Sequence, residues 1–199
     1  VRSTAAHGWV TAQGAIVETA NISGKVVADL RPSPVPNDDL EYALGVIHGL
    51  VYGDGSREER GSYRIRLCGD KAELGLYFDM AGFSFKMVDS DPRYRIAGRE
   101  EWADLKALPV SPGDKPDYLL GFLRGWFACD GCVSTRPNAT IAVGGEEVSW
   151  LRRWGALAGW HFGAATKLSN VTNYGVRNKE IFNLNLRTRM IGPDEFILS

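Results

Sequence analysis

The chain has 199 residues, of which 44% are hydrophobic, and its 23 basic and 24 acidic side chains leave a formal net charge of −1. This apolar content is enough for one substantial core or two small ones, which excludes a disordered chain. The longest apolar runs reach only about half of the roughly 20 residues that a membrane span requires, and the N-terminus lacks the basic and apolar stretches of a signal peptide.

The first predicted helix runs from a cap at Asn37 or Asp38 to about Tyr52. Its sequence returns 76 residues further along the chain, which indicates an internal repeat. The second copy predicts a helix that is capped by Asp114 and has Pro116 in its first turn. Six of the 14 aligned positions are identical between Tyr42-Ala-Leu-Gly-Val-Ile-His-Gly-Leu-Val-Tyr-Gly-Asp-Gly55 and Tyr118-Leu-Leu-Gly-Phe-Leu-Arg-Gly-Trp-Phe-Ala-Cys-Asp-Gly131.

Strands and further helices follow the first copy. Alternating side chains predict a strand in which Ser62, Arg64 and Arg66 face one way and their neighbours Tyr63, Ile65 and Leu67 the other. A glycine, Gly82, is expected to end the next helix. The remaining elements of the first half are a helix over Lys71 to Ala81, strands over Phe85 to Val88 and Arg93 to Ala97, and a helix over Glu100 to Leu108 that Pro109 ends.

The second half repeats this series. It offers a helix over Glu147 to Ala158 that Gly159 ends, and strands over Ala164 to Leu168 and Glu180 to Leu186 that a longer polar connection joins. The closing helix is absent or reduced to a stub at Pro193 to Leu198. We therefore expect an α+β fold, a duplicated αββαββα unit, in three parts: residues 1–36, 37–112 and 113–199.

Two glycines stand four residues apart in both repeated helices, Gly45 with Gly49 and Gly121 with Gly125. Glycine inside a soluble helix costs about 1 kcal/mol relative to alanine, so four matching glycines require a packing reason. Faces without side chains allow two backbones to approach closely. We expect the two helices to pack against each other across a pseudo-twofold axis.

This packing brings two carboxylates, Asp54 and Asp130, together at one end of the helix pair. Like charges close to two negative helix ends favour a cation between them. A hard divalent ion, Mg²⁺ or Mn²⁺, accepts carboxylate and carbonyl oxygens together with water, and it can activate water for attack on a phosphodiester. The structural alternative is that each Asp-Gly step only forms the turn from helix to strand.

The two repeated segments, from Leu44 to Gly55 and from Leu120 to Gly131, resemble the signature of the LAGLIDADG family. The likeness spans residues 38 to about 187. It implies a monomeric, two-motif homing endonuclease with two antiparallel sheets that form a DNA-binding saddle. By this resemblance the metal ligands are the Asp54 and Asp130 carboxylates and the carbonyl groups of Gly53 and Cys129.

The resemblance also assigns a role to one lysine. Lys106-Ala-Leu-Pro109 is similar to a lysine feature that precedes the second motif in inteins of this family, which implies that Lys106 stabilises charge at the cleaved phosphate. A solvated helix lysine is the alternative for Lys106, and Lys115 is the fallback for the catalytic role.

The segment Arg2-Ser-Thr-Ala-Ala-His7 resembles the Thr-x-x-His block of intein splicing domains, with Thr4 and His7 as the residues that assist splicing. The chain starts at Val1 and lacks a terminal His-Asn, so we do not expect it to splice alone. Residues 1–36 are then either a remnant of a splicing domain or half of a divided one, which a complementary intein fragment would complete.

Double-stranded DNA is the expected partner, because a twisted antiparallel sheet can lie along the major groove. The near-zero net charge argues weakly against this, although residues 131–199 carry 8 basic and 5 acidic side chains. An ordinary solvent-facing sheet is the alternative for each position. Polar residues on the predicted strands are the candidates: Arg64, Arg66, Lys86, Arg93, Arg95, Asn138, Thr140, Lys167, Asn183, Asn185 and Arg187, with Lys179 beside them.

The cysteines bear on the compartment. Cys68, Cys129 and Cys132 are few and odd in number, which favours a reducing compartment, and we expect a cytoplasmic protein encoded by a bacterium, archaeon, phage or organelle. A zinc site at the Cys129–Cys132 pair lacks two further ligands at suitable spacing. Two other functions remain open: a non-cleaving DNA-binding module, such as a regulator or maturase, and an inactive intein remnant.

Overall fold

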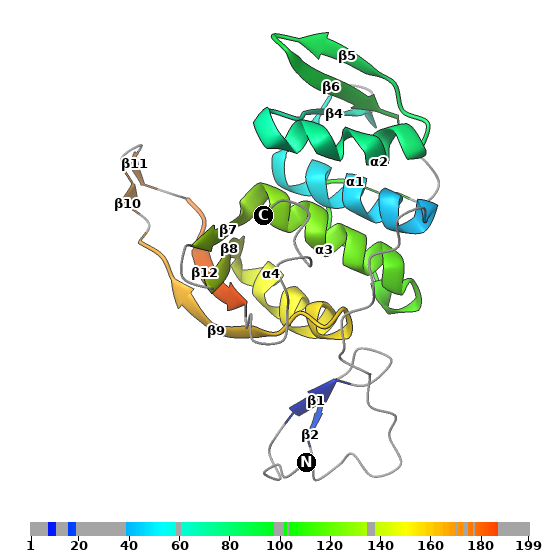
Figure 1. Cartoon of the computed structure of the whole chain (residues 1–199). Helices are drawn as coiled ribbons and strands as arrows, with labels where there is room; N and C mark the ends of the chain where they lie inside the picture. The colour runs from blue at the N-terminus through cyan, green and yellow to red at the C-terminus, as the bar shows by residue number, and fades with distance from the viewer. Residues whose placement is uncertain are drawn as a thin grey trace. The chain divides into compact units, whose positions relative to one another are not determined.

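A computed structural model of the chain describes residues 8–10, 16–18, 39–58, 61–97, 102, 104–134, 138–169, 171–172, 175–176 and 178–186 (Figure 1). Contacts divide the chain into two compact units. Unit 2 takes its described residues from Val35–Val110 and Asp117–Cys132, and unit 1 takes them from Val1–Pro34, Ser111–Pro116 and Val133–Gly192. Across these described ranges, no helix has both the length and the apolar character that crossing a membrane requires.

Unit 2 contains both repeated helices. They are α1 (Leu40–Asp54) and α3 (Pro116–Asp130), and they lie side by side in Figure 1. Ten consecutive residues of each helix are buried, from Tyr42 to Val51 and from Tyr118 to Phe127. A helix that is buried on all sides needs a close partner, and each helix is the partner of the other.

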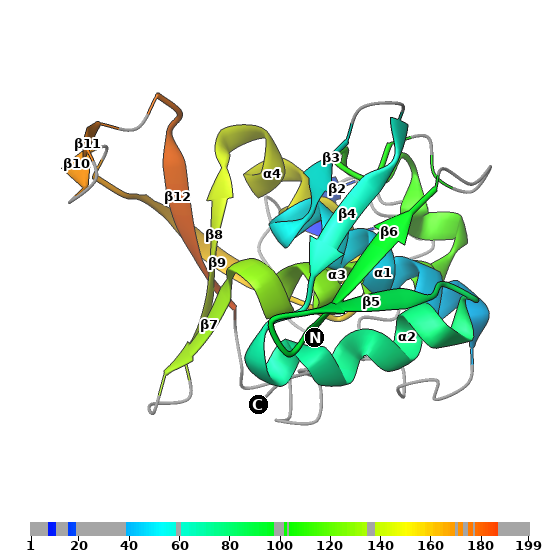
Figure 2. The ribbon, with the colours of Figure 1, turned by 90° about the horizontal axis from the view of Figure 1, so that it is seen from above.

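The sheet of unit 2 is four-stranded and antiparallel, in the order β3 (Ser56–Arg57), β4 (Tyr63–Arg66), β6 (Asp91–Ile96) and β5 (Phe85–Val88). Figure 2 looks down on β4, β5 and β6. One face of this sheet is buried, where the Tyr94 ring stacks on Phe78 with centroids 4.1 Å apart. Phe78 belongs to α2 (Gly75–Met80), which follows a 3-10 turn over Gly69–Leu74.

Unit 1 contains the second four-stranded antiparallel sheet, in the order β7 (Gly131–Ser134), β8 (Asn138–Gly144), β12 (Ile181–Leu186) and β9 (Phe162–Lys167). The chain enters β7 from the last residues of unit 2. Helix α4 (Gly145–Trp150) continues into a π-helical turn over Leu151–Gly155. Two short hairpins complete the described strands: β1 (Gly8–Val10) with β2 (Ile16–Glu18), and β10 (Val171–Thr172) with β11 (Gly175–Val176).

The predicted duplication is confirmed at the level of elements. Each half has a long helix, two strands, a shorter helix and two further strands of its sheet, and the second half adds the β10–β11 hairpin. The shorter helices end alike, because the amides of Phe83 and Trp160 donate to the carbonyls of Phe78 and Gly155, five residues earlier. Gly82 and Gly159 make this turn possible with φ angles of 77° and 80°, which other residues rarely adopt.

Both predicted helix caps are wrong. Helix α1 begins at Leu40, so its cap is Asp39, whose carboxylate accepts a 2.7 Å hydrogen bond from the Glu41 amide. Asn37 and Asp38 lie outside the described residues. Asp114 ends a 3-10 turn over Pro112–Asp114 instead of capping α3, which starts at Pro116 as expected for a first helical position.

The helix predicted over Glu100 to Leu108 is also wrong where the structure describes it, because residues 104–110 form turns. The Asp104 carboxylate accepts a 2.8 Å hydrogen bond from the Lys106 amide, and the Ala107 amide donates to the Asp104 carbonyl at 3.1 Å. An aspartate that binds a backbone amide two residues later competes with helix formation. The stub predicted at Pro193 to Leu198 lies outside the described residues.

Candidate active site and nucleic-acid interface

The four glycines of the repeated helices form a reciprocal contact, as predicted. A Cβ atom at Gly45 would overlap the carbonyl oxygen of Tyr118, and one at Gly121 would overlap that of Tyr42. The second pair repeats the arrangement, because a Cβ at Gly49 or at Gly125 would overlap a carbonyl oxygen of the opposite helix in the same way. Any larger residue would therefore force the two backbones apart.

Side chains repeat the same reciprocity. The Tyr118 hydroxyl lies 2.6 Å from Nδ1 of His48, and the Tyr42 hydroxyl accepts a 3.2 Å hydrogen bond from Arg124. In the repeat, Tyr42 corresponds to Tyr118, and His48 corresponds to Arg124. Tyr118 thus contacts His48 in the same way as Tyr42 contacts Arg124, which is what a twofold relation between the helices requires. His48 is buried, and burial lowers its pKa to about 4 despite a 2.9 Å hydrogen bond from Nε2 to the Ala107 carbonyl.

The two carboxylates end these helices at the same end of the pair. Asp54 and Asp130 are the last helical residues, whereas the sequence placed them just past the helix ends. A Cβ atom built on Gly53 would lie 3.5 Å from Oδ2 of Asp130 and 3.1 Å from Sγ of Cys129. Gly53, the residue before Asp54, therefore lies beside the Asp130 carboxylate at this end of the helix pair.

Each carboxylate has a partner of its own. Lys71 forms an ion pair with Asp54 through Nζ and Oδ2. The indole Nε1 of Trp126 donates a 2.9 Å hydrogen bond to Oδ2 of Asp130. The side chains of Lys71 and Asp54 are 26% and 39% exposed, so solvent reaches this end of the helix pair.

Lys106 lies at the same end. Its ammonium group donates to the carbonyl of Val51 at 3.1 Å, to that of Tyr52 and to that of Gly53 at 3.5 Å. These carbonyls belong to the last turn of α1, where a cation offsets the negative end of the helix dipole. The fallback residue Lys115 is exposed and directly precedes the first residue of α3, whereas Asp130 is the last, so the helix separates them.

The loop that carries Lys106 is held by Asp104. Its carboxylate accepts hydrogen bonds from the Tyr63 hydroxyl at 2.7 Å and from Arg57 at 3.1 Å, in addition to the Lys106 amide. The amide bond and the tyrosine hydrogen bond lower the pKa of Asp104 below its ordinary value. Asp104 is therefore the residue that positions Lys106.

The electrostatics of the site couple both acids to both lysines. Burial acts to lower the pKa of Lys71, but the hydrogen bond with Asp54 and the charges of Asp54 and Asp130 raise it above its ordinary value. Burial lowers the pKa of Lys106, and the same two carboxylates oppose this shift. Burial and the neighbouring charge of Asp54 also raise the pKa of the Cys129 thiol, which stays protonated.

The oxygen atoms at this site fit a hard cation that keeps most of its water. The ligands predicted from the sequence are two carboxylates and the carbonyls of Gly53 and Cys129, and Mg²⁺ is commonly held by one or two protein carboxylates. Within the described ranges no group of three His, Cys, Asp or Glu side chains gathers around a common point. Lys71 already engages Oδ2 of Asp54, so a cation that binds this oxygen would compete with the ammonium group.

The outer face of the unit 2 sheet is basic. Lys86 lies opposite Arg93, which lies opposite Arg66, and Arg95 lies opposite Arg64. Residues paired across neighbouring strands point to the same face, so the five predicted basic side chains lie together. Three of them form ion pairs: Arg64 and Arg95 with Glu58, and Arg66 with Asp89 and Asp91.

The outer face of the unit 1 sheet has uncharged polar side chains. Asn185 lies opposite Thr140, and Asn183 lies between Ala142 and Thr166. Lys167 lies opposite Phe182, so it belongs to the other face and is not brought together with the two asparagines. It forms an ion pair with Glu180. The side chain of Asn138 and the residues Arg187, Thr4 and His7 lie outside the described part of the chain.

Sequence reasoning missed Lys71, Trp126 and Asp104. Lys71 reads as the first residue of an exposed helix, and Trp126 as one more apolar residue of a buried one. Asp130 does lie four residues after Trp126, a spacing that places both side chains on one helix face. Nothing in the sequence places Lys71 beside Asp54, because that contact depends on how the sheet turns the chain back towards α1.

No family model and no curated protein matches the sequence. The structure is similar to full-length DUF199/WhiA from Thermatoga maritima, with a TM-score of 0.53 and 14% identity over 81% of this chain and 54% of that one. It is also similar to the N-terminal LAGLIDADG domain of DUF199/WhiA, with a TM-score of 0.49 and 14% identity over 77% of this chain and 80% of that one. A third similar structure is the homing endonuclease I-DmoI in complex with DNA and Mn. Its TM-score is 0.47 and its identity is 14%, over 76% of this chain and 92% of that one.

The structure has an α+β architecture with two four-stranded antiparallel sheets, which confirms the expected fold class, and full-length DUF199/WhiA has a similar fold. At 14% identity the likeness concerns the fold alone.

Proposed function

We propose that this chain is a site-specific endonuclease that hydrolyses phosphodiester bonds of double-stranded DNA with the help of Mg²⁺ or Mn²⁺. The observation that supports this most is the meeting of Asp54 and Asp130 at one solvent-accessible end of the glycine-packed helix pair. Two acidic chain positions that are brought together by a repeated close contact are suited to hold a cation. If each Asp-Gly step only formed a turn from helix to strand, neither the sequence repeat nor the close contact between the helices would be needed.

The protein's own side chains have distinct roles in this proposal. Asp54 and Asp130 would hold the cation, with the carbonyls of Gly53 and Cys129 as further donors. Trp126 keeps the Asp130 carboxylate in place through its 2.9 Å hydrogen bond. Lys106, whose ammonium group lies against the last turn of α1, contributes positive charge beside the scissile phosphate. A bound divalent cation supplies an activated water and stabilises the leaving oxygen.

DNA would lie on the outer faces of the two sheets. The basic face of unit 2 can neutralise phosphates and donate paired hydrogen bonds to guanine, and the asparagines of unit 1 can do so to adenine. Because the two faces differ in charge, each would read its own part of an asymmetric target. One chain carries both faces, so the active form in this proposal is a monomer.

A cleavage assay tests the proposal. Duplexes that bind the protein are selected from a random library in EDTA, and the enriched duplex is then incubated with the protein and Mg²⁺ or Mn²⁺. We expect metal-dependent cutting that Asp54→Asn and Asp130→Asn each reduce by at least a hundredfold. Asp79→Asn, an exposed aspartate on α2 of the same unit, is the matched control and should cut like the parent chain.

Binding without cutting in either metal would contradict the nuclease proposal and support a DNA-binding module. The ion pair between Lys71 and Asp54 is the observation that favours this second function, because Lys71 satisfies the carboxylate without a cation. Failure to enrich any duplex would contradict both functions and leave an inactive remnant. The proposal that the endonuclease derives from an intein, with residues 1–36 as the splicing part, rests on the sequence resemblance of Thr4 and His7.

A further inference from the structure

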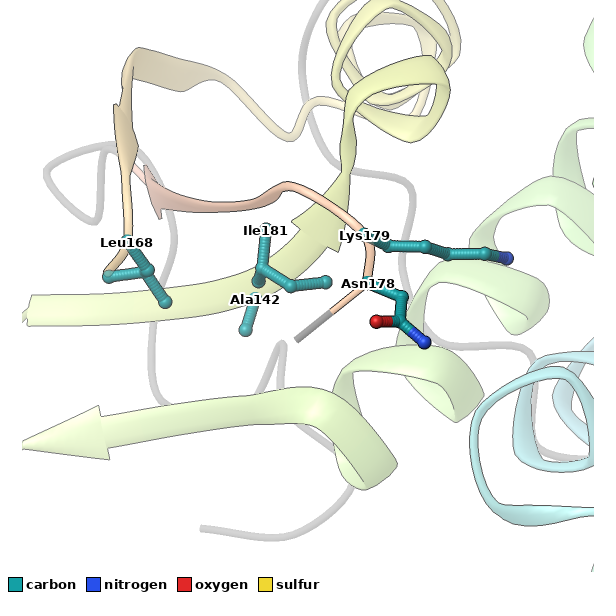
Figure 3. Close-up of a pocket in the computed structure, with 5 residues that line it drawn as sticks. All are labelled: Ala142, Leu168, Asn178, Lys179 and Ile181. Atoms are coloured by element: carbon teal, nitrogen blue, oxygen red, sulfur yellow. The ribbon is translucent and has the colours of Figure 1, made fainter. Parts of the chain in front are cut away.

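The outer face of the unit 1 sheet carries an open pocket as well as its asparagines. Ala142, Leu168, Asn178, Lys179 and Ile181 line it (Figure 3). Ala142 lies opposite Asn183, and Ile181 precedes Asn183 by two residues on the same strand, so both apolar side chains share the face of the asparagines. The pocket is therefore part of the surface that the proposed function assigns to DNA.

The pocket combines an apolar floor with a polar rim. Among the described residues that line it, Ala142, Leu168 and Ile181 are apolar, and Asn178 and Lys179 are polar and exposed. Ile181 and Leu168 are adjacent on neighbouring chain segments, since the Leu168 amide donates a 2.9 Å hydrogen bond to the Ile181 carbonyl. The two apolar side chains are thereby held next to each other.

The charge of this face is compatible with a nucleic acid and disfavours a basic partner. The described strand residues on this face, from Thr140 and Ala142 on β8 to Asn183 and Asn185 on β12, include no carboxylate. Lys179 at the rim adds one positive charge, which can meet a phosphate. Glu180, the nearest acidic residue along the chain, is engaged by Lys167.

We propose that this face reads a segment rich in A·T pairs and that the pocket receives the methyl group of a thymine. The thymine C5-methyl is an apolar group on the major-groove edge, and the amide of asparagine matches the adenine edge with two hydrogen bonds. The basic face of unit 2 has arginines where this face has asparagines and an apolar pocket, so it would read guanines. This inference rests on the proposed DNA binding but does not require cleavage.

Removal of single methyl groups from the DNA tests it. In the duplex enriched from the random library, each thymine is replaced in turn by deoxyuracil, and the dissociation constant is measured by fluorescence anisotropy in EDTA. We expect one or two replacements in an A·T-rich segment to weaken binding about fourfold, the effect of one buried methyl group. In Ile181→Thr, which keeps a β-branched side chain, thymine and uracil at that position should bind alike.

Val88→Thr, on the outer face of the unit 2 sheet, also puts a threonine in place of an apolar β-branched residue; it is the matched control and should keep the preference for thymine. Ala142→Ser is a second pocket variant in case Ile181→Thr does not fold. If a duplex is enriched but no thymine is sensitive to demethylation, or if both pocket variants keep the preference, the inference is wrong while the proposed function stands. If no duplex is enriched, the proposed function itself has failed.

Discussion

In the proposed site, the ion pair between Lys71 and Asp54 would govern how readily a cation binds. Like the proposed metal, Lys71 neutralises a carboxylate close to a second one. The two positive groups therefore compete for the same oxygen. Removing the ammonium group leaves two carboxylates without their nearest counter-charge, and a divalent ion should then bind more strongly.

We predict that Lys71→Met increases Mn²⁺ affinity by roughly tenfold, equivalent to about 1.4 kcal/mol. Isothermal titration calorimetry of the DNA-free protein measures it. Lys86→Met removes an exposed lysine from the sheet of the same unit and should leave the affinity unchanged. An unchanged or weaker affinity in Lys71→Met would show that the lysine does not occupy the cation's position.

The buried His48 makes stability depend on pH. Its pKa is about 4 in the folded chain and about 6.5 when unfolded, so the unfolded state takes up the proton first as the pH falls. Stability from this residue is complete above about pH 6.5 and is lost progressively down to about pH 4, by about 3 kcal/mol in all.

In His48→Gln, the free energy of unfolding should lose most of its dependence on pH between 6.5 and 4. Urea denaturation at closely spaced pH values measures this. Asp104, whose pKa is lowered in the folded chain, contributes a pH dependence only below about pH 5, so the range from pH 6.5 to about 5 reports on His48. The same slope in both proteins would mean that His48 is not the titrating group.

Single residues differ in how far the sequence could predict them. The position of Asp54 and Asp130 at one end of the helix pair could be predicted, because the same glycine spacing occurs in both repeated helices. The contact of Lys71 with Asp54 could not be predicted, because it depends on the turn that follows β4. Lys106 was singled out by resemblance, but its contacts with the carbonyls of α1 depend on Asp104, whose turn conformation overrides the helical pattern.

Among the elements, the helix pair is the most sensitive to substitution. A Cβ at Gly49 would lie 2.6 Å from the Trp126 amide nitrogen in addition to overlapping the Phe122 carbonyl. We predict that Gly49→Ala lowers the free energy of unfolding by about 3 kcal/mol, the upper range for overpacking against rigid backbone. Urea denaturation followed by tryptophan fluorescence measures this change.

Gly145→Ala is the matched control, because Gly145 is also helical but a Cβ there would meet only a Phe182 ring carbon at 3.7 Å. Alanine should be neutral or stabilise by up to about 1 kcal/mol at this position. Equal effects of the two substitutions would mean that the close approach at Gly49 adds nothing beyond helix propensity.

The strands and the ends of helices at a glycine could be predicted from the sequence, but the first residues of the helices could not. The predicted strand over Phe85 to Val88 has the observed bounds, although Phe85, Lys86 and Met87 are all exposed in the structure. Asp39 competes with Asn37 and Asp38 as a cap, and all three have suitable side chains, so local sequence does not choose among them. The π-helical turn over Leu151–Gly155 has no signal that periodicity can detect.

For the whole molecule, charge is distributed unevenly in spite of a net charge of −1. Lys86 and Arg93 have no ion-pair partner among the described residues, whereas Arg64, Arg66 and Arg95 do. The first two are thus the side chains most able to replace counterions on DNA. Composition alone argues against a nucleic-acid partner, and only the strand register shows that the basic residues share a face.

We predict that the double variant Lys86→Ala, Arg93→Ala lowers the slope of log K against log salt concentration by about 2 for the enriched duplex. Asn185→Ala, on the outer face of the unit 1 sheet, should weaken binding without changing the slope. Anisotropy titrations at several salt concentrations distinguish these effects. A slope that responds to Asn185→Ala as much as to the basic pair would argue against separate electrostatic and base-reading surfaces.

The reciprocal glycine contacts have a consequence for how the two halves can diverge. Each helix receives from its neighbour the same contacts that it provides, which is the geometric condition for an isologous, two-subunit assembly. Two identical subunits would have to share every substitution. Covalent fusion removes that constraint, so His48 faces a tyrosine where Arg124 faces another, and Lys71 stands where the second half has Glu147. A single polypeptide can thus keep a symmetric scaffold and still treat its two acidic positions differently.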